Sequence, residues 1–200
     1  PYPDKPISRG KILSKEDIER LGHFERYRDV DGDAIGYRTL PGTDHPAAGY
    51  FTRGSGHNAK AQYSERPNDY VENMERLTRK FETARNRAPA PVTQEAENKE
   101  IGIIAYGTSH WAMVEALDQL KKEYEIDASY LRVRAFPFNE QVKGFIRRHS
   151  RVYVVDQNRD AQMCQLLRLE ADAEDIPKLR SVLHYNGLPI DARSVTDSIV

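Results

Sequence analysis

Strand and helix patterns alternate through the second half of the chain, and this alternation constrains the fold more than any other feature. The run from Ile101 to Tyr106 is apolar and ends at Gly107, which is typical of a strand covered on both faces. We expect Thr108 or Ser109 to cap a helix after this turn, because a hydroxyl can accept from free helical N–H groups. Apolar residues three and four positions apart indicate that helix: Met113, Val114, Leu117 and Leu120.

The same unit repeats toward the end of the chain. Further strands are predicted over residues 129–136, 151–155 and 179–184. Helices are predicted over residues 139–149, 160–171 and 193–199. Because crossovers between parallel strands are right-handed, this order favours an α/β fold. We predict a mostly parallel, doubly wound sheet with helices on both faces, whereas the strand order does not follow from the pattern.

Composition narrows the classes of protein. The 200 residues carry a net charge of −1, and a dedicated nucleic-acid binder should instead show a basic face. No apolar run reaches the length of a membrane span. Only 38% of the residues are hydrophobic, which suggests a long polar arm beside the α/β core. The chain begins with Pro1, and we expect it to be part of a longer polypeptide.

A single cysteine, Cys164, limits the redox chemistry. One cysteine excludes a disulfide scaffold and fits a reducing compartment, so a cytoplasmic location is expected. It cannot hold an iron–sulfur cluster alone, because such clusters usually need four thiolates. Cys164 lies on the apolar side of its helix and is interpreted as a core residue. His110 and His184 are interpreted as hydrogen-bonded scaffold residues.

The first half of the chain shows little regular structure. Residues 1–13 are interpreted as an extended arm, followed by a short helix that Ser14 caps and Gly22 ends. A hairpin is predicted over residues 27–39, turning at Asp31-Gly32. Residues 40–67 form a long loop, and such loops tend to be functional or to lie on a partner.

One long helix is predicted over residues 68–86. Its apolar stripe is narrow, so we expect it to pack against something outside itself. Residues 88–97 have the composition of a linker and mark the predicted domain boundary. The stripe consists of Tyr70, Met74, Leu77 and Phe81.

Asp29, Asp31 and Asp33 alternate as in a calcium loop. Such a loop needs glycine at its sixth position and a bidentate acid at its twelfth. Counting from Asp29, those positions hold Ala34 and Leu40. A hairpin turn is therefore favoured over a metal site.

The segment from residue 37 to residue 57 concentrates arginines and histidines among glycines. Arginine binds carboxylates through two parallel hydrogen bonds, and imidazole can donate to a carbonyl. The functional interpretation is a loop that approaches an anionic substrate. A structural interpretation, an arm held against a neighbouring subunit, is favoured. The residues concerned are Arg38, His45, Arg53 and His57.

Polar residues follow the predicted strand 151–155. This edge of an open α/β sheet usually binds ligands. Asp156 and Asp160, however, bring negative charge to the position that an anion would occupy. Capping and interdomain or interface contacts by Asp156, Asn158, Arg159 and Asp160 are therefore favoured over ligand binding.

Several segments resemble one enzyme family. The chain is similar, in the same order, to the C-terminal part of the α subunit of 2-oxoglutarate:ferredoxin oxidoreductases, within the 2-oxoacid:ferredoxin oxidoreductase family. The family has glutamate before Gln157 where this chain has Asp156. The segments that carry the resemblance span residues 37–43, 51–57, 79–84, 134–138 and 156–162.

The resemblance implies the domains and the activity. Residues 1–90 would be the end of a pyrimidine-binding domain with its connector, and residues 97–200 a transketolase C-terminal-like domain that acts as a scaffold. The whole enzyme would decarboxylate a 2-oxoacid on thiamine diphosphate, release an acyl-coenzyme A and pass electrons to ferredoxin. We expect this chain to be inactive alone.

The resemblance also implies the partners. Thiamine diphosphate, magnesium and the iron–sulfur cluster would belong to the β subunit, and the substrate threonine motif would lie upstream of Pro1. This segment would contact the β subunit, the upstream part of the α subunit and a second α subunit. Coenzyme A and ferredoxin would bind to the whole complex.

Two alternatives remain open at this stage. The chain could be a free-standing α/β assembly or regulatory module without catalytic activity. A nucleotide-binding α/β protein is disfavoured, because Gly107-Thr108-Ser109 is too short to be a phosphate-binding glycine loop.

Overall fold

The computed structural model describes residues 4, 6–50, 54 and 56–200. The chain divides into two compact units, Pro1–Ala84 and Arg85–Val200, which are described separately. No helix in the described ranges is long and apolar enough to cross a membrane.

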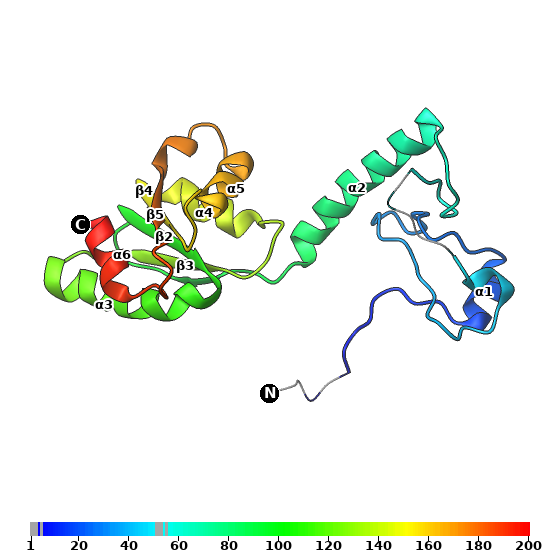
Figure 1. The fold of residues 1–200 in the computed structure, drawn as a ribbon, viewed down its shortest axis with the longest axis horizontal. Coiled ribbons are helices and arrows are strands. Elements are labelled where there is room, and N and C mark those ends of the chain that lie inside the picture. The colour runs from blue at the N-terminus through cyan, green and yellow to red at the C-terminus, as the bar shows by residue number, and fades with distance from the viewer. Residues whose placement is uncertain (1–3, 5, 51–53, 55) are drawn as a thin grey trace. The chain divides into compact units, whose positions relative to one another are not determined.

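The second unit contains a five-stranded sheet (Figure 1). Its strands are β1 (Val92–Gln94), β2 (Ile101–Tyr106), β3 (Ser129–Val133), β4 (Arg151–Asp156) and β5 (Leu179–Leu183). The order is β1-β3-β2-β4-β5; β1 pairs antiparallel with β3, and the other neighbours pair in parallel. The predicted α/β fold with a mostly parallel sheet is confirmed.

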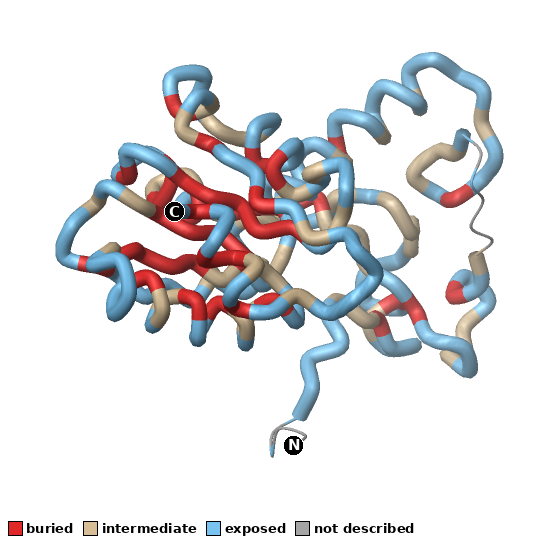
Figure 2. Tube along the Cα trace, turned by 60° about the vertical axis from the view of Figure 1, so that its left-hand side comes forward, coloured by how far each residue is buried: buried red, intermediate tan, exposed pale blue. Residues whose placement is uncertain are grey.

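Helices cover both faces of this sheet. They are α3 (His110–Tyr124), α4 (Glu140–Arg148), α5 (Gln162–Glu170) and α6 (Ala192–Ile199), with short 3₁₀ turns η2 (Gly107–Ser109) and η3 (Ile176–Lys178). One core lies between the sheet and α3 and α6, and the other lies between the sheet and α4 and α5. Successive side chains of β2 point to opposite faces of the sheet, so Ile103 lies in the first core and Ile104 in the second. Figure 2 shows buried residues concentrated along the strands.

Three local expectations in this unit were wrong. The strand predicted to reach residue 136 ends at Val133. Residues 92–94, assigned by composition to a linker, form the edge strand β1. The expected hydroxyl cap of α3 is absent, because neither Ser109 nor Thr108 caps the helix. The side-chain amide of Gln157 instead donates hydrogen bonds to the hydroxyls of Ser109 (3.0 Å) and Thr108 (3.4 Å).

The first unit contains α1 (Lys15–Leu21), the 3₁₀ turn η1 (Pro46–Ala48) and most of α2 (Pro67–Arg87). The predicted cap of α1 is confirmed: Ser14 and Asp17 form a capping box, and Gly22 ends the helix in a left-handed conformation. A small core of Leu13, Ile18 and Ala48 packs with Phe24 and Tyr37.

The hairpin predicted over residues 27–39 does not form. The carboxylate of Asp29 accepts hydrogen bonds from the backbone N–H groups of Gly32 (2.9 Å) and Ala34 (3.0 Å), so the segment curls around that side chain. Arg38 instead makes an isolated parallel bridge to Ile12. The described residues of this unit contain no extended strand.

Glu125, which ends α3, offers a test of backbone strain. It holds φ = 57°, a left-handed conformation that glycine adopts without cost. Glu125→Gly is expected to raise the free energy of unfolding by about 0.5–1 kcal/mol. Urea unfolding measures the change. Glu115→Gly, in the exposed middle of the same helix, should instead lower the free energy of unfolding by about 1 kcal/mol. Stabilisation by both variants would contradict the explanation.

His149 predicts a dependence of stability on pH. Its side chain is 1% exposed; Nδ1 lies 2.7 Å from the carbonyl oxygen of Phe145, and Nε2 has no partner among the described residues. Burial lowers the pKa of His149 below its usual value. The unfolded chain then binds this proton more readily than the folded chain, so the free energy of unfolding should fall as the pH drops below about 6.5. His149→Gln should flatten this slope between pH 7 and pH 5, and an unchanged slope would assign it to other groups.

Candidate functional site

The first candidate site lies at the carboxyl ends of β2 and β4. The chain continues to opposite sides of β2 at this point, and open α/β sheets usually bind ligands at such a switch point. Asp156 ends β4 with a fully buried side chain. Its carboxylate accepts from the hydroxyl of Tyr106 (2.6 Å), the amide of Asn158 (2.5 Å) and the backbone N–H of Met163 (2.8 Å). Burial, with Asp156 nearby, raises the pKa of Tyr106 to about 12. Both groups are thus committed to internal contacts.

The residues after Asp156 organise the start of α5. The side-chain oxygen of Asn158 accepts from the backbone N–H groups of Asp160 (3.0 Å) and Gln162 (3.3 Å). Arg159 and Asp160 pair with each other at 2.7 Å on the surface. Because Gln157 also bridges to η2, the polar groups of this crevice already bond to one another. The geometry supports capping here, and the exposed Arg159 and Asp160 remain candidates for an interface.

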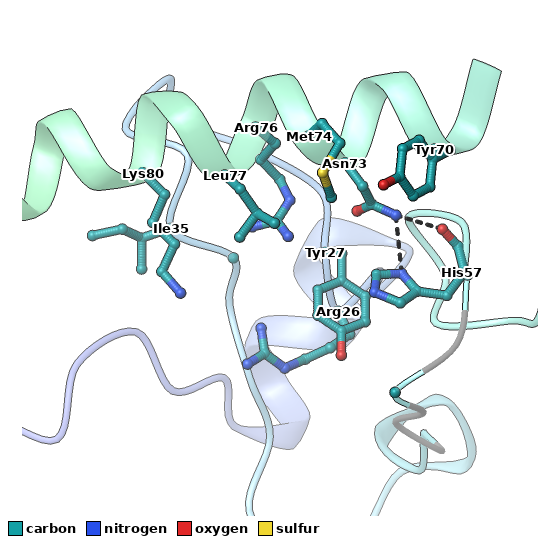
Figure 3. Close-up of a pocket in the computed structure, with 13 residues that line it drawn as sticks. Arg26, Tyr27, Ile35, His57, Tyr70, Asn73, Met74, Arg76, Leu77 and Lys80 are labelled. Atoms are coloured by element: carbon teal, nitrogen blue, oxygen red, sulfur yellow. Dashed lines mark hydrogen bonds between the residues drawn. The ribbon is translucent and has the colours of Figure 1, made fainter. Parts of the chain in front are cut away.

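The second place is a cavity of about 350 Å³ in the first unit (Figure 3). It lies between α2 and the loops that precede it. Its charged and hydrogen-bonding side chains are Arg26, Tyr27, His57, Tyr70, Asn73, Arg76 and Lys80. No carboxylate lines the cavity among the described residues.

Arg76 is the most unusual residue of the cavity. Its side chain points inward from α2, and the residue is only 8% exposed. It donates to the carbonyl oxygen of Ala34 at 3.4 Å, and its Nε has no partner in the described part of the chain. Burial, and secondarily the positive charge of Arg26, lower the pKa of Arg76.

Tyr27 holds the cationic side chains together. Its ring lies 5.4 Å from the guanidinium carbon of Arg76 and 5.1 Å from that of Arg26. The ring of His57 stacks on Tyr27 with centroids 4.0 Å apart. The backbone oxygen of His57 accepts from the side chain of Asn73 at 2.5 Å. One aromatic ring therefore brings two arginines and a histidine from separate segments to one cavity.

Of the four residues proposed for the 37–57 loop, the three that the structure describes do not form one cluster. His57 lines the cavity. Arg38 donates to the backbone oxygen of Arg9 at 2.6 Å, and His45 accepts from the N–H of Ala47 at 3.1 Å. Neither Arg38 nor His45 lines the cavity. Arg53 lies outside the described residues.

Sequence reasoning missed Arg26, Arg76 and Lys80. It followed the apolar stripe of α2, whose residues Tyr70, Met74 and Phe81 are in fact largely exposed. A usable signal was the spacing of Asn73, Arg76 and Lys80 at i, i+3 and i+7, which places polar side chains on one helical face.

The acidic cluster of Asp29, Asp31 and Asp33 brings carboxylate oxygens within 4.8 Å of one another. The ammonium of Lys11 lies 2.5 Å from Asp31 and 2.6 Å from Asp33. The cluster is thus a loop of three carboxylates whose charge Lys11 balances in part.

These features define a protein with an open, doubly wound α/β unit and another unit, the first in the chain, that contains a cationic cavity. Neither a protein-family model nor a curated protein matches the chain. A solved 2-oxoglutarate:ferredoxin oxidoreductase from Magnetococcus marinus, with 2-oxoglutarate, coenzyme A and succinyl-CoA bound, is similar at 19% identity and a TM-score of 0.74. The match covers 89% of this chain and 30% of that one. At this identity the match establishes a shared fold. The chain spans less than a third of the length of the solved protein.

Two further solved structures overlap a smaller part of the chain. One is an inactive β4 tetramer of a split-gene transketolase, at 18% identity and a TM-score of 0.42 over 54% of this chain and 40% of that one. The other is the α chain of a probable 2-oxoacid ferredoxin oxidoreductase from Thermoplasma acidophilum, at 24% identity and a TM-score of 0.35 over 55% of this chain and 93% of that one.

Proposed function

We propose that this chain is the C-terminal part of the α subunit of a 2-oxoacid:ferredoxin oxidoreductase, with 2-oxoglutarate as the substrate. The observation that carries the proposal is the fold similarity over 89% of the chain, with a TM-score of 0.74, to an enzyme of that activity. The segments of similar sequence, which follow one another in the same order from residues 37–43 to residues 156–162, support the same assignment. The reaction is the oxidative decarboxylation of the 2-oxoacid to an acyl-coenzyme A.

An iron–sulfur cluster does not fit the described residues of this chain. An iron–sulfur cluster needs several thiolates, and the one cysteine, Cys164, is buried in the second core. The carboxylates of Asp31 and Asp33, which could otherwise attract magnesium, share an ion pair with the ammonium of Lys11. In this proposal thiamine diphosphate, magnesium and the cluster belong to the β subunit.

The role of this segment is assembly. Tyr70 and Phe81 on α2 are 61% and 50% exposed, which is unusual for large aromatic side chains in a free-standing unit. Contact with the β subunit, the upstream part of the α subunit or a second α subunit would cover them. Ferredoxin would dock on the whole complex.

The substrate role of the loop is tested in the whole enzyme. Arg53→Ala and His57→Ala should each lower kcat/KM for 2-oxoglutarate about tenfold or more, because each removes a hydrogen bond to a charged group. Arg20→Ala, on the exposed face of α1, is the matched control and should leave turnover unchanged. Unchanged turnover in both loop variants would remove the pocket role and leave assembly as the function of the segment.

The assignment as a partial subunit has its own test. The chain alone should neither oxidise 2-oxoglutarate nor retain thiamine diphosphate through gel filtration. Addition of the β subunit and the upstream part of the α subunit should restore both properties. Oxidation of a 2-oxoacid by the chain alone would contradict the proposal.

A further inference from the structure

Cationic side chains line the cavity under α2, and no carboxylate lines it among the described residues. Neither Arg26 nor Arg76 forms an ion pair with a carboxylate among the described residues, and Asp29 offsets the charge of Arg76 only from a longer distance. The Nε atoms of both arginines are buried without a partner in this part of the chain. The acceptor described for each guanidinium is a backbone carbonyl oxygen, of Tyr37 for Arg26 and of Ala34 for Arg76. A buried charge left without its partner destabilises a protein strongly. The arrangement therefore calls for an anion that comes from outside this part of the chain.

We infer that the cavity binds the oxyanion of a small molecule, a carboxylate or a phosphate group, between Arg76 and Arg26. A guanidinium can offer such an oxyanion two parallel N–H donors. Lys80 adds a further cation at the same wall, and the half-buried His57 lines another. Figure 3 shows these side chains entering the cavity from α2 and from two separate loops.

The size and lining of the cavity favour a small molecule over an acidic side chain of another polypeptide. Its volume of about 350 Å³ falls in the range of ligand pockets. Its walls combine the aromatic rings of Tyr27 and Tyr70 with the apolar side chains of Ile35 and Leu77. Such walls can cover the uncharged part of a ligand while the arginines hold its anionic group.

The inference goes beyond the proposed oxidoreductase role and does not depend on it. It concerns Arg26 and Arg76, which lie outside the segments of family resemblance. It is also tested on the 200-residue chain itself, in the absence of any turnover.

Isothermal titration of the full chain provides the test, with inorganic phosphate and succinate as separate probes at constant ionic strength. At least one probe should bind saturably, with a dissociation constant of the order of 1 mM. Arg76→Met should weaken that binding at least tenfold, because it removes the donors while keeping an apolar side chain of similar length. Arg20→Gln, which removes an exposed arginine on α1, should bind like the unaltered chain.

The two probes separate the sources of the anion. Tighter binding of phosphate indicates a phosphorylated ligand, and tighter binding of succinate indicates a carboxylate ligand. Saturable binding that Arg76→Met leaves unchanged overturns the inference. The absence of saturable binding by either probe also overturns it, and would assign the cavity to an acidic segment of another polypeptide.

A second variant guards against misfolding. Circular dichroism should show the same helix content in Arg76→Met as in the unaltered chain. If the helix content of Arg76→Met differs, Arg26→Met is used in its place, with the same expected tenfold loss of affinity for the probe. Nuclear magnetic resonance of the unaltered chain supplies a further check, since the probe that binds should shift His57 and Asn73 signals. Shifts confined to other residues count against the site.

Discussion

Asp156→Ala is expected to lower the free energy of unfolding by about 3 kcal/mol or more, because a buried donor that loses its acceptor costs about 1–3 kcal/mol. The fully buried carboxylate accepts from three donors, those of Tyr106, Asn158 and Met163. Alanine leaves all three without this acceptor and creates a small cavity. Urea unfolding of the full chain, followed by circular dichroism, measures the loss.

Two variants separate the buried carboxylate from its exposed neighbour. Asp156→Asn keeps the shape but turns one oxygen into a donor that faces other donors, so it should also destabilise the second unit. Asp160→Asn removes a surface charge that pairs, in the described part of the chain, with Arg159 alone, and it should change stability by less than about 1 kcal/mol. Equal effects at the two positions would contradict the account of the β4 terminus.

Gly102→Ala is expected to destabilise the second unit by about 1–3 kcal/mol, the usual cost of overpacking a dense core. A Cβ at this position would lie 2.7 Å from Cε1 of Phe145 and 3.0 Å from Cγ of His149. Both rings are almost fully buried, so neither can swing away into solvent. The packing of α4 on β2 therefore depends on the missing side chain. Urea unfolding of the variant measures the loss.

Gly144→Ala is the matched control on α4. A Cβ there meets only the guanidinium of Arg148, at 3.7 Å, and alanine is the better helix former. This variant should gain up to about 1 kcal/mol under the same conditions. A gain at both glycines would show that the β2–α4 contact adjusts more easily than its geometry indicates.

Periodicity predicted the α/β core because burial is nearly continuous along β2, β3 and β4. β2 and β4 are apolar over nearly their whole length, and both faces are covered by helices. β1 could not be predicted in this way. Its three residues are all exposed, and its conformation depends on pairing with β3, which lies far along the chain. A short stretch between prolines and polar residues carries no local signal of that partner.

The candidate site was harder to predict for a related reason. The polar segment after β4 was recognised, but its central contact joins Asp156 to Tyr106, fifty residues earlier in the chain. The apolar stripe of α2 was expected to be its packing face, because large apolar residues normally mark the buried face. In the structure Tyr70, Met74 and Phe81 of that stripe are exposed, and Arg76 is buried. Helical periodicity reports which residues share a face but not which face another segment covers.

The arrangement of the strands limits how copies or partners could join this unit. One edge of the sheet is β1, which is only three residues long. The other edge is β5, where Arg180 and Ser181 are exposed and the guanidinium of Arg180 donates to the backbone oxygens of Pro177 and Leu179. Short borders and outward charges discourage an incoming strand from extending a sheet. Association through shared backbone ladders is therefore disfavoured, and recognition falls to side chains displayed by helices and loops.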